Sequence, residues 1–419
     1  MPRGLIATDK NNFQPRVGIA WDVTGNGRTA VRAGVGVFHT LPGSRMTTFA
    51  RLSPPFEVGL NVVPYSFSDP YHGTEEPFPY NPVNPRFAYP IQMFSLSPDF
   101  RDGYTSHFNF NIERQLSEQL FMEVGYFGTV GHKLTSLREA NTATYTPTAT
   151  PADVQSRRPF FPQYYASIAT VFSGGNSNYH SLQVKLDKRL SRGLTFGVAY
   201  TFSKSIDQIS ENRESGVGGN GPQDPNNYLG GERGLSAFDQ RHILAINGVW
   251  DMPFWKNKGL VSHILGGWRL GGLTRITSGL PFSVNSGLDQ VLGGSGFWTG
   301  DQRMDVVGNT TLDPGRPHGE LVARYFDTSG FGLPEIGRYG NSGRNILIGP
   351  GFADTDLSII KSFPLPREKG QFEFRGEIFN LFNNVNFYNP DALFVSPAFG
   401  RLLTARDARI AQLALRFTF

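Results

Sequence analysis

The chain ends in a segment in which every second residue is apolar. The period of two runs from residue 409 to the terminal Phe419 and is the period of a β-strand, whose successive side chains point to opposite faces. The length of about ten residues is that of a tilted strand crossing a bilayer. One face carries Ala411, Leu413, Leu415, Phe417 and Phe419, and the other carries Ile410, Gln412, Ala414, Arg416 and Thr418.

The same alternation recurs upstream. In 371–378, Phe372, Phe374 and Ile378 alternate with charged residues, and segment 16–23 has the same period. The pattern predicts about eleven strands. Their expected ranges are 16–23, 28–39, 104–116, 119–130, 178–190, 193–205, 239–250, 266–278, 353–363, 371–383 and 409–419.

The connections between these strands alternate between short and long. A compact soluble domain rarely has several long unstructured loops. A transmembrane barrel has short periplasmic turns and long extracellular loops. The short connections are 24–27, 117–119, 191–193, 253–259 and 364–370, and the long ones are 40–103, 131–177, 206–238, 279–352 and 384–408.

These observations predict an all-β fold, an antiparallel transmembrane β-barrel that occupies residues 1–419. The expected location is the outer membrane of a Gram-negative bacterium, in contact with its lipid. Since the last strand should end in the periplasm, we expect a periplasmic C-terminus and extracellular long loops.

Composition agrees with this fold. Aromatic residues reach 13%, and 49 Gly and 29 Pro disfavour helices. No apolar run is long enough for a transmembrane helix, but a barrel strand exposes only alternate residues to lipid. A net charge of +4 without a basic run gives no reason to expect nucleic acid as a partner. The absence of cysteine removes disulfides and thiol chemistry.

The two faces of the strands predict different surroundings. We expect the charged alternates to line a wet lumen and to pair with one another. Aromatic residues near strand ends suggest interfacial girdles, with ordinary core packing as the alternative. The charged set is Lys185, Asp187, Glu373, Arg375, Glu377 and Arg416, and the aromatic set is Tyr126, Phe127, Tyr200, Phe202, Trp250 and Trp255.

Eleven strands cannot close into a fully antiparallel barrel, because the first and last strands would run parallel to each other. Either the strand count is off by one, or these are the C-terminal half of a barrel of roughly 22 strands, the size of plugged outer-membrane transporters. We favour the second reading. It implies further strands, a plug domain and a signal peptide that residues 1–15 do not supply.

The sequence contains no recognisable set of catalytic or metal-ligating residues. We therefore expect that the protein is not an enzyme and binds no cofactor and no metal. Asp301, Asp305 and Asp313 lack EF-hand spacing and fit turn formation better than calcium binding. Residues 216–221 are Gly-rich but lack the Lys-Ser/Thr of a phosphate loop. No segment is expected to form a helix that could hold histidine ligands. The histidines are His39, His72, His107, His132, His180, His242, His263 and His318.

Several segments resemble a known family along essentially the whole chain. They are residues 13–22, 29–38, 232–242 (ERGLSAFDQRH), 376–387 (GEIFNLFNNVNF) and 413–419. In this order they resemble the C-terminal barrel region of TonB-dependent receptors, specifically the Oar-like barrels. The resemblance implies uptake of a large or scarce ligand, with a plug domain and TonB as partners. It also implies that the barrel-assembly machinery reads Leu415, Phe417 and Phe419.

Two other function classes remain open. The chain could be an outer-membrane adhesion or structural barrel that transports nothing, or a soluble secreted all-β protein. The ligand and its binding residues are unknown at this stage, because the long loops carry no readable chemistry.

Overall fold

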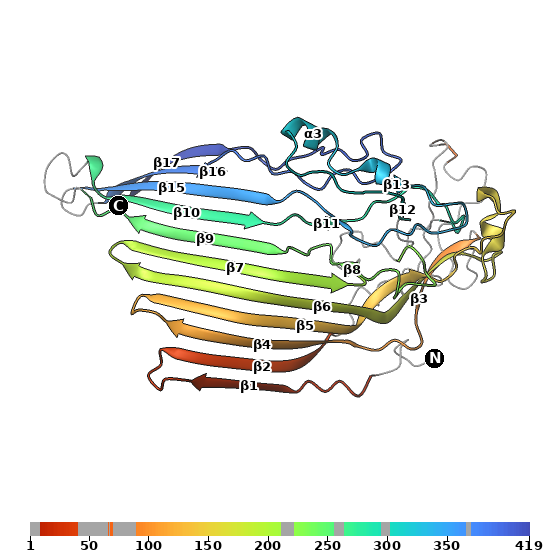
Figure 1. Cartoon of the computed structure of the whole chain (residues 1–419), viewed down its shortest axis with the longest axis horizontal. Helices are drawn as coiled ribbons and strands as arrows, with labels where there is room; N and C mark the ends of the chain where they lie inside the picture. Colours follow the sequence, from red (N-terminus) through yellow and green to blue (C-terminus); the bar gives the residue numbers. More distant parts are fainter. Residues whose placement is uncertain are drawn as a thin grey trace.

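The computed structural model describes residues 9–40, 66, 68–69, 89–210, 222–254, 264–294, 302–365 and 370–419. Eleven long strands lie side by side in chain order, and each is antiparallel to its neighbours (Figure 1). They are β1 (Arg16–Asp22), β2 (Thr29–Thr40), β4 (Gly103–Gln115), β5 (Leu120–Glu139), β6 (Tyr165–Ser191), β7 (Leu194–Asp207), β9 (His242–Asp251), β10 (Trp268–Thr277), β15 (Phe352–Pro364), β16 (Gln371–Phe379) and β17 (Ile410–Thr418).

The predicted all-β, antiparallel class is confirmed, and each predicted strand falls on a strand of this sheet. The short connections 24–27, 117–119 and 191–193 lie at one end of the sheet, and the described parts of the long connections lie at the other (Figure 1). No helix in the described ranges has the length and apolarity needed to span a membrane.

The end of the sheet with the short connections, which we call the short-turn end, is built from tight turns. Between β6 and β7, Arg192 and Gly193 both have positive φ, 51° and 81°, which is the requirement of a type I′ hairpin turn. A Cβ on Gly193 would lie 2.5 Å from the carbonyl oxygen of Asp251, so only glycine fits beside the neighbouring strand. After β1, the Asp22 carboxylate accepts hydrogen bonds from the amides of Gly25 and Gly27 and holds that turn.

At the other end, β5 and β6 extend well beyond their predicted limits. We expected a loop over 131–177, but the two strands stay paired to Glu139 and from Ala169, with irregularities between Gly131 and Thr135. β3 (Ile91–Leu96) runs parallel to this extension of β6. Phe100, Ala169 and Val171 form a small core there. The alternation of apolar and polar residues breaks in this extension because adjacent residues such as Val171 and Phe172 are both buried.

β16 ends earlier than predicted because of an asparagine-rich turn. Asn380 has a φ of 52°, which asparagine tolerates better than most residues, and its amide Nδ2 donates to the carbonyls of Asn384 and Asp407. Asn386 both donates to and accepts from the backbone of Ala353 on β15. The segment 380–386 therefore ties β16 to the strand beside it.

Where the long connections are described, they fold into a structured layer, which we call the cap: residues 140–164, 222–241, 278–294, 302–351 and 380–409. A buried cluster forms within it, from Phe282, Val284, Met304, Phe326, Phe331 and Leu347. Its short elements are η1 (Pro151–Asp153), η2 (Gln155–Arg157), β8 (Gly234–Leu235), β11 (Pro281–Phe282), β12 (Asp305–Val306), α3 (His318–Ala323), η4 (Thr328–Gly330), β13 (Phe331–Gly332) and β14 (Leu347–Ile348). The expectation that no helix would carry a histidine was wrong, since α3 begins at His318.

Candidate functional site: the polar wall and the cap

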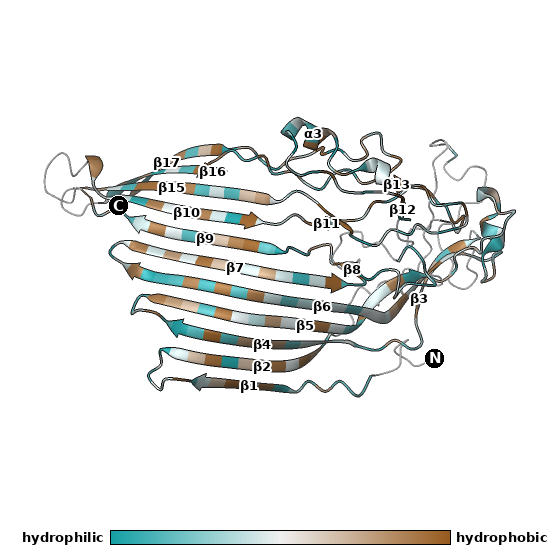
Figure 2. Ribbon diagram, in the orientation of Figure 1, coloured by the Kyte–Doolittle hydropathy of each residue, from teal (hydrophilic) through white to brown (hydrophobic). Residues whose placement is uncertain are grey.

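The register of the sheet separates its side chains into two walls. Residues directly opposite one another in an antiparallel pair face the same side. Val184 pairs with Val124 and Tyr200, whereas its neighbour Lys185 pairs with Glu123 and Ala199. Figure 2 shows the resulting alternation of hydrophilic and hydrophobic residues along the strands. We call the two sides the apolar wall and the polar wall.

The apolar wall is free of carboxylates. With β5 taken to residue 132 and β6 from residue 178, no Asp or Glu occupies it in the register of the eleven described strands. Its apolar side chains are nevertheless open: Leu415 is 71% exposed and Ile19 is 64% exposed. In water such a surface would drive aggregation, so it requires an apolar environment. The cations on this wall are Arg114, Lys188, Lys204 and Lys361.

The polar wall carries the charged residues expected from the sequence. Lys185 forms an ion pair with Asp187 at 2.7 Å, and Arg375 contacts Glu373 at 3.2 Å. Pairing also crosses strands, from Arg32 on β2 to Glu113 on β4 at 2.8 Å. The predicted placement of all six charged residues on one face is confirmed. Glu377 lies 3.7 Å from Arg375, and Arg416 lies opposite Glu373 in the register.

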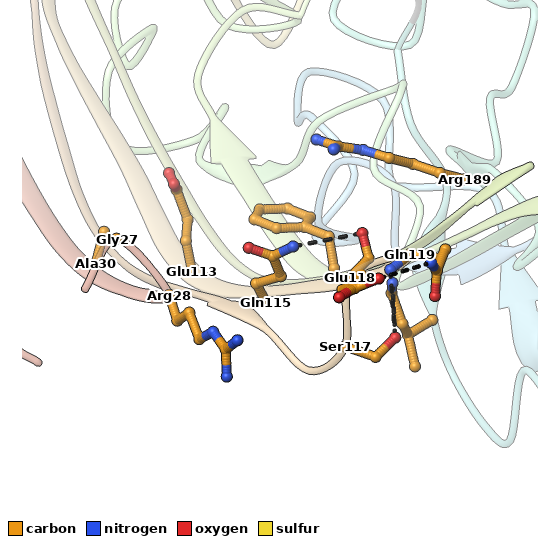
Figure 3. A pocket seen from close by; sticks show the side chains of 11 residues that line it. Gly27, Arg28, Ala30, Glu113, Gln115, Ser117, Glu118, Gln119 and Arg189 are labelled. Carbon is orange, nitrogen blue, oxygen red and sulfur yellow. Dashed lines mark hydrogen bonds between the residues drawn. The ribbon is translucent and has the colours of Figure 1, made fainter.

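Three hollows open on the polar wall. One of about 390 Å³ lies over β9, β10 and β15 and includes Asn247, Asp356 and Glu377. Another of about 410 Å³ lies at the cap end, where the Arg406 guanidinium is 5.0 Å from the Phe352 ring. A third, of about 210 Å³, lies at the short-turn end (Figure 3). These hollows could hold polar groups of another chain or of a solute.

The third hollow is shaped by the turn between β4 and β5. Gln115 Nε2 donates to the carbonyl of Glu118 at 3.4 Å, and Ser117 Oγ accepts from the amide of Leu120 (Figure 3). Arg28 and Arg189 contribute positive charge to its rim, and Glu113 and Glu118 contribute negative charge.

The aromatic residues expected in girdles are divided between the walls. Tyr126, Tyr200, Phe202 and Trp250 lie on the apolar wall. Phe127 was assigned wrongly: it pairs with Asn109 and Ser181 on the polar wall, because adjacent strand residues point to opposite sides. Trp255 lies outside the described residues.

Two buried ion pairs hold the cap, one within it and one between it and the sheet, and the sequence predicts neither. Arg303 Nη1 lies 2.9 Å from Glu232 Oε2, and these side chains are 5% and 6% exposed. The remaining donors of Arg303 reach the carbonyls of Ser342 and Gly231. Arg344 pairs with Asp207 at the end of β7. Glu232 opens the motif at 232–242, but its partner lies 71 residues away, so no local signal reveals the pair.

The same motif fastens the ends of β7 and β9. The Asp239 carboxylate accepts from the amide of Ser205 at 2.5 Å, and the hydroxyls of Ser205 and Ser236 are 2.7 Å apart. All three residues are buried. The motif is therefore structural, and it fixes where the cap meets the sheet.

Electrostatics in the cap follow from pairing and burial. The Arg338 guanidinium holds the pKa of the Asp305 carboxyl below its usual value, and burial lowers the pKa of Arg158. Burial raises the pKa of the Tyr325 phenol to about 12. Asp305 is thus an ion-pair partner, and Asp313 accepts from the amide of Gly315, the turn-forming contact that its sequence context suggested.

Within the described ranges, no group of three or more His, Asp or Glu residues could hold a metal ion. Asp301, His72 and His263 lie outside the described residues. The assembly role of Leu415, Phe417 and Phe419 stays a prediction. These three side chains are exposed, and the rings of Phe417 and Phe419 stack with centroids 5.7 Å apart.

Comparison with known proteins identifies the family. The model of the family described as Outer membrane beta barrel domain matches residues 1–412. The outer membrane transporter YddB from Escherichia coli is similar in structure, with a TM-score of 0.51 and 9% identity over 96% of this chain and 40% of that one. The FrpB iron transporter (F3-3 variant) from Neisseria meningitidis gives a TM-score of 0.45 and 10% identity, over 96% of this chain and 39% of that one.

The chain therefore spans about two fifths of the length of these transporters, and at such low identity the likeness concerns the fold. None of the curated proteins compared with the chain matches it. The resemblance noted in the sequence is confirmed at the level of the outer-membrane barrel family, since the family model covers nearly the whole chain. With a family match over nearly its whole length and two walls of opposite polarity, the chain belongs to the outer membrane beta barrel domain family.

Proposed function

We propose that this chain forms part of the barrel wall of a TonB-dependent outer-membrane transporter and catalyses no reaction. The observation that carries the proposal is the separation of charge between the walls. The polar wall bears paired charges and open hollows, as the lining of an aqueous path would, and the apolar wall lacks carboxylates, as contact with lipid would require.

The sheet edges suggest that more strands complete the barrel. Among the described residues, β1 pairs only with β2 and β17 only with β16. Unpaired backbone groups are costly in lipid, and the two edge strands run in the same direction. We propose that further strands pair with both edges. Eleven strands would then supply half of a barrel of roughly 22 strands, wide enough to hold a plug domain that faces the polar wall.

The orientation we propose puts the cap outside the cell and the short turns in the periplasm. Because the chain contains no cysteine, single substitutions give an unambiguous test. Thr148 in the cap and Glu118 in a short turn are both exposed. We expect a membrane-impermeant maleimide to label Thr148→Cys in intact cells and Glu118→Cys only after lysis. Labelling of Glu118→Cys in intact cells would reverse the orientation.

Transport itself needs a separate measurement, because adhesion by the cap is the competing function. We expect wild-type cells to deplete from rich medium at least one compound too large to diffuse through open pores, as followed by mass spectrometry. Cells lacking the protein should leave that compound in the medium and attach to surfaces normally. Unchanged depletion with lost attachment would replace the transporter by an adhesion barrel.

A further inference from the structure

Near the cap end, the apolar wall carries two tyrosine–histidine pairs of the same geometry. The hydroxyl of Tyr126 on β5 lies 2.7 Å from Nδ1 of His180 on β6, and the hydroxyl of Tyr200 on β7 lies 2.7 Å from Nδ1 of His242 on β9. The rings stack with centroids 6.0 and 6.1 Å apart. We call these four residues, with Lys204 and Arg241, the Tyr–His margin.

The hydrogen bonds orient both histidines in the same way. A phenol hydroxyl is a good donor, and a neutral imidazole accepts on the nitrogen without a proton. In the tautomer in which the hydroxyl donates to Nδ1, the proton of each ring lies on Nε2. Among the described contacts, the ring hydrogen bonds of His180 and His242 involve Nδ1, so in this tautomer each Nε2–H is available to an acceptor beyond the wall.

Two cations lie in the same group. Lys204 is exposed and pairs with His180 in the register of β6 and β7. Arg241 precedes His242, and its guanidinium carbon is 5.8 Å from the ring centroid of Phe202. Because the described apolar wall has no carboxylate, Lys204 has no counter-charge on that surface, and the Arg241 guanidinium reaches Phe202 of the same wall from the residue before β9. The margin presents two N–H donors and two positive charges, which suits a phosphate.

The position of the Tyr–His margin along the strands sets its depth in the membrane. β9 has 10 residues, from His242 at the cap end to Asp251 at the short-turn end. A tilted transmembrane strand needs about 9–11 residues, so the margin lies where the apolar band ends and lipid headgroups begin. Lysine and arginine side chains at this level extend to the headgroups and attract anionic lipid.

We propose that the Tyr–His margin binds the phosphate groups of the phosphorylated glycolipid of the outer leaflet, lipid A. The phosphate oxygens would accept from the two Nε2–H groups and lie beside Lys204 and Arg241, while the acyl chains lie along the apolar wall below. This inference rests on the proposed orientation, which the cysteine labelling tests independently.

The test uses the protein extracted from outer membranes as the cell produces it, freed of lipid in detergent and titrated with diphosphoryl lipid A. Native mass spectrometry measures the bound fraction. We expect the double variant Lys204→Gln, Arg241→Gln to bind about thirtyfold more weakly, from the loss of two interfacial cations. Arg114→Gln is the matched control, since Arg114 is an exposed cation of the same wall at the short-turn end, and its affinity should not change.

A second variant, His180→Phe with His242→Phe, keeps the ring volume and removes the Nε2–H donors, and it should also weaken binding. Heat-modified mobility on gels verifies that each variant is folded. Three results would overturn the proposal: equal affinity for dephosphorylated lipid A, full competition by inorganic phosphate at equal concentration, or an equal loss in Arg114→Gln. If cysteine labelling places the cap outside the cell and one of these three results is obtained, the lipid A proposal fails and the proposed orientation stands. If the labelling is reversed, the orientation itself is refuted, and the lipid A proposal falls with it.

Discussion

Val184→Arg is expected to prevent most of the protein from inserting into the outer membrane. Val184 lies on the apolar wall of β6, between Val124 and Tyr200 and away from both ends of the strand. An arginine near the middle of the lipid face of a barrel costs about 2–4 kcal/mol. The measurement is the amount of heat-modifiable protein in isolated outer membranes.

The neighbouring residue gives a control with the same introduced side chain. Gln183 lies on the polar wall, opposite Gly125 and Thr201, so Gln183→Arg should insert nearly as well as the wild type. Similar losses in the two variants would mean that the walls do not face lipid and water as proposed. A loss confined to Gln183→Arg would mean that the wall assignments are reversed.

Arg303→Met is expected to destabilise the cap by about 3–5 kcal/mol, because it leaves the buried Glu232 carboxylate without its counter-charge. The predicted consequence is rapid cleavage of the 278–351 connection by added protease and a lower urea midpoint. Arg269→Gln breaks the Arg269–Asp251 pair, whose side chains are 51% and 43% exposed, and should cost less than about 1 kcal/mol.

A double variant separates charge from hydrogen bonding. Glu232→Leu combined with Arg303→Met removes both charges and should recover much of the lost stability. If the double variant is as unstable as Arg303→Met, the contacts of Arg303 with the carbonyls of Ser342 and Gly231 account for the loss, and the ion pair does not.

The sequence by itself determined the sheet and its two walls. Alternation predicts strands because successive side chains point to opposite faces, and antiparallel pairing of such strands places Lys185, Glu373 and Arg375 on one side without any knowledge of distant contacts. Alternation also excludes Phe127 from the aromatic girdle. Tyr126 lies on the apolar wall, so the next residue along the strand must face the polar wall.

The tertiary structure alone decided the cap and what it joins. Glu232 meets Arg303 and Asp207 meets Arg344 across separations of 71 and 137 residues, and nothing in the local pattern selects these partners. β5 and β6 extend into the cap, and β3 pairs in parallel with the extended part of β6. These features depend on packing within the cap, where no lipid imposes an alternation of apolar and polar residues. A bilayer requires every second residue of a strand to be apolar, so the strands can be predicted from the sequence. The fold of a cap in water depends on contacts between residues far apart in the chain, which no local pattern predicts.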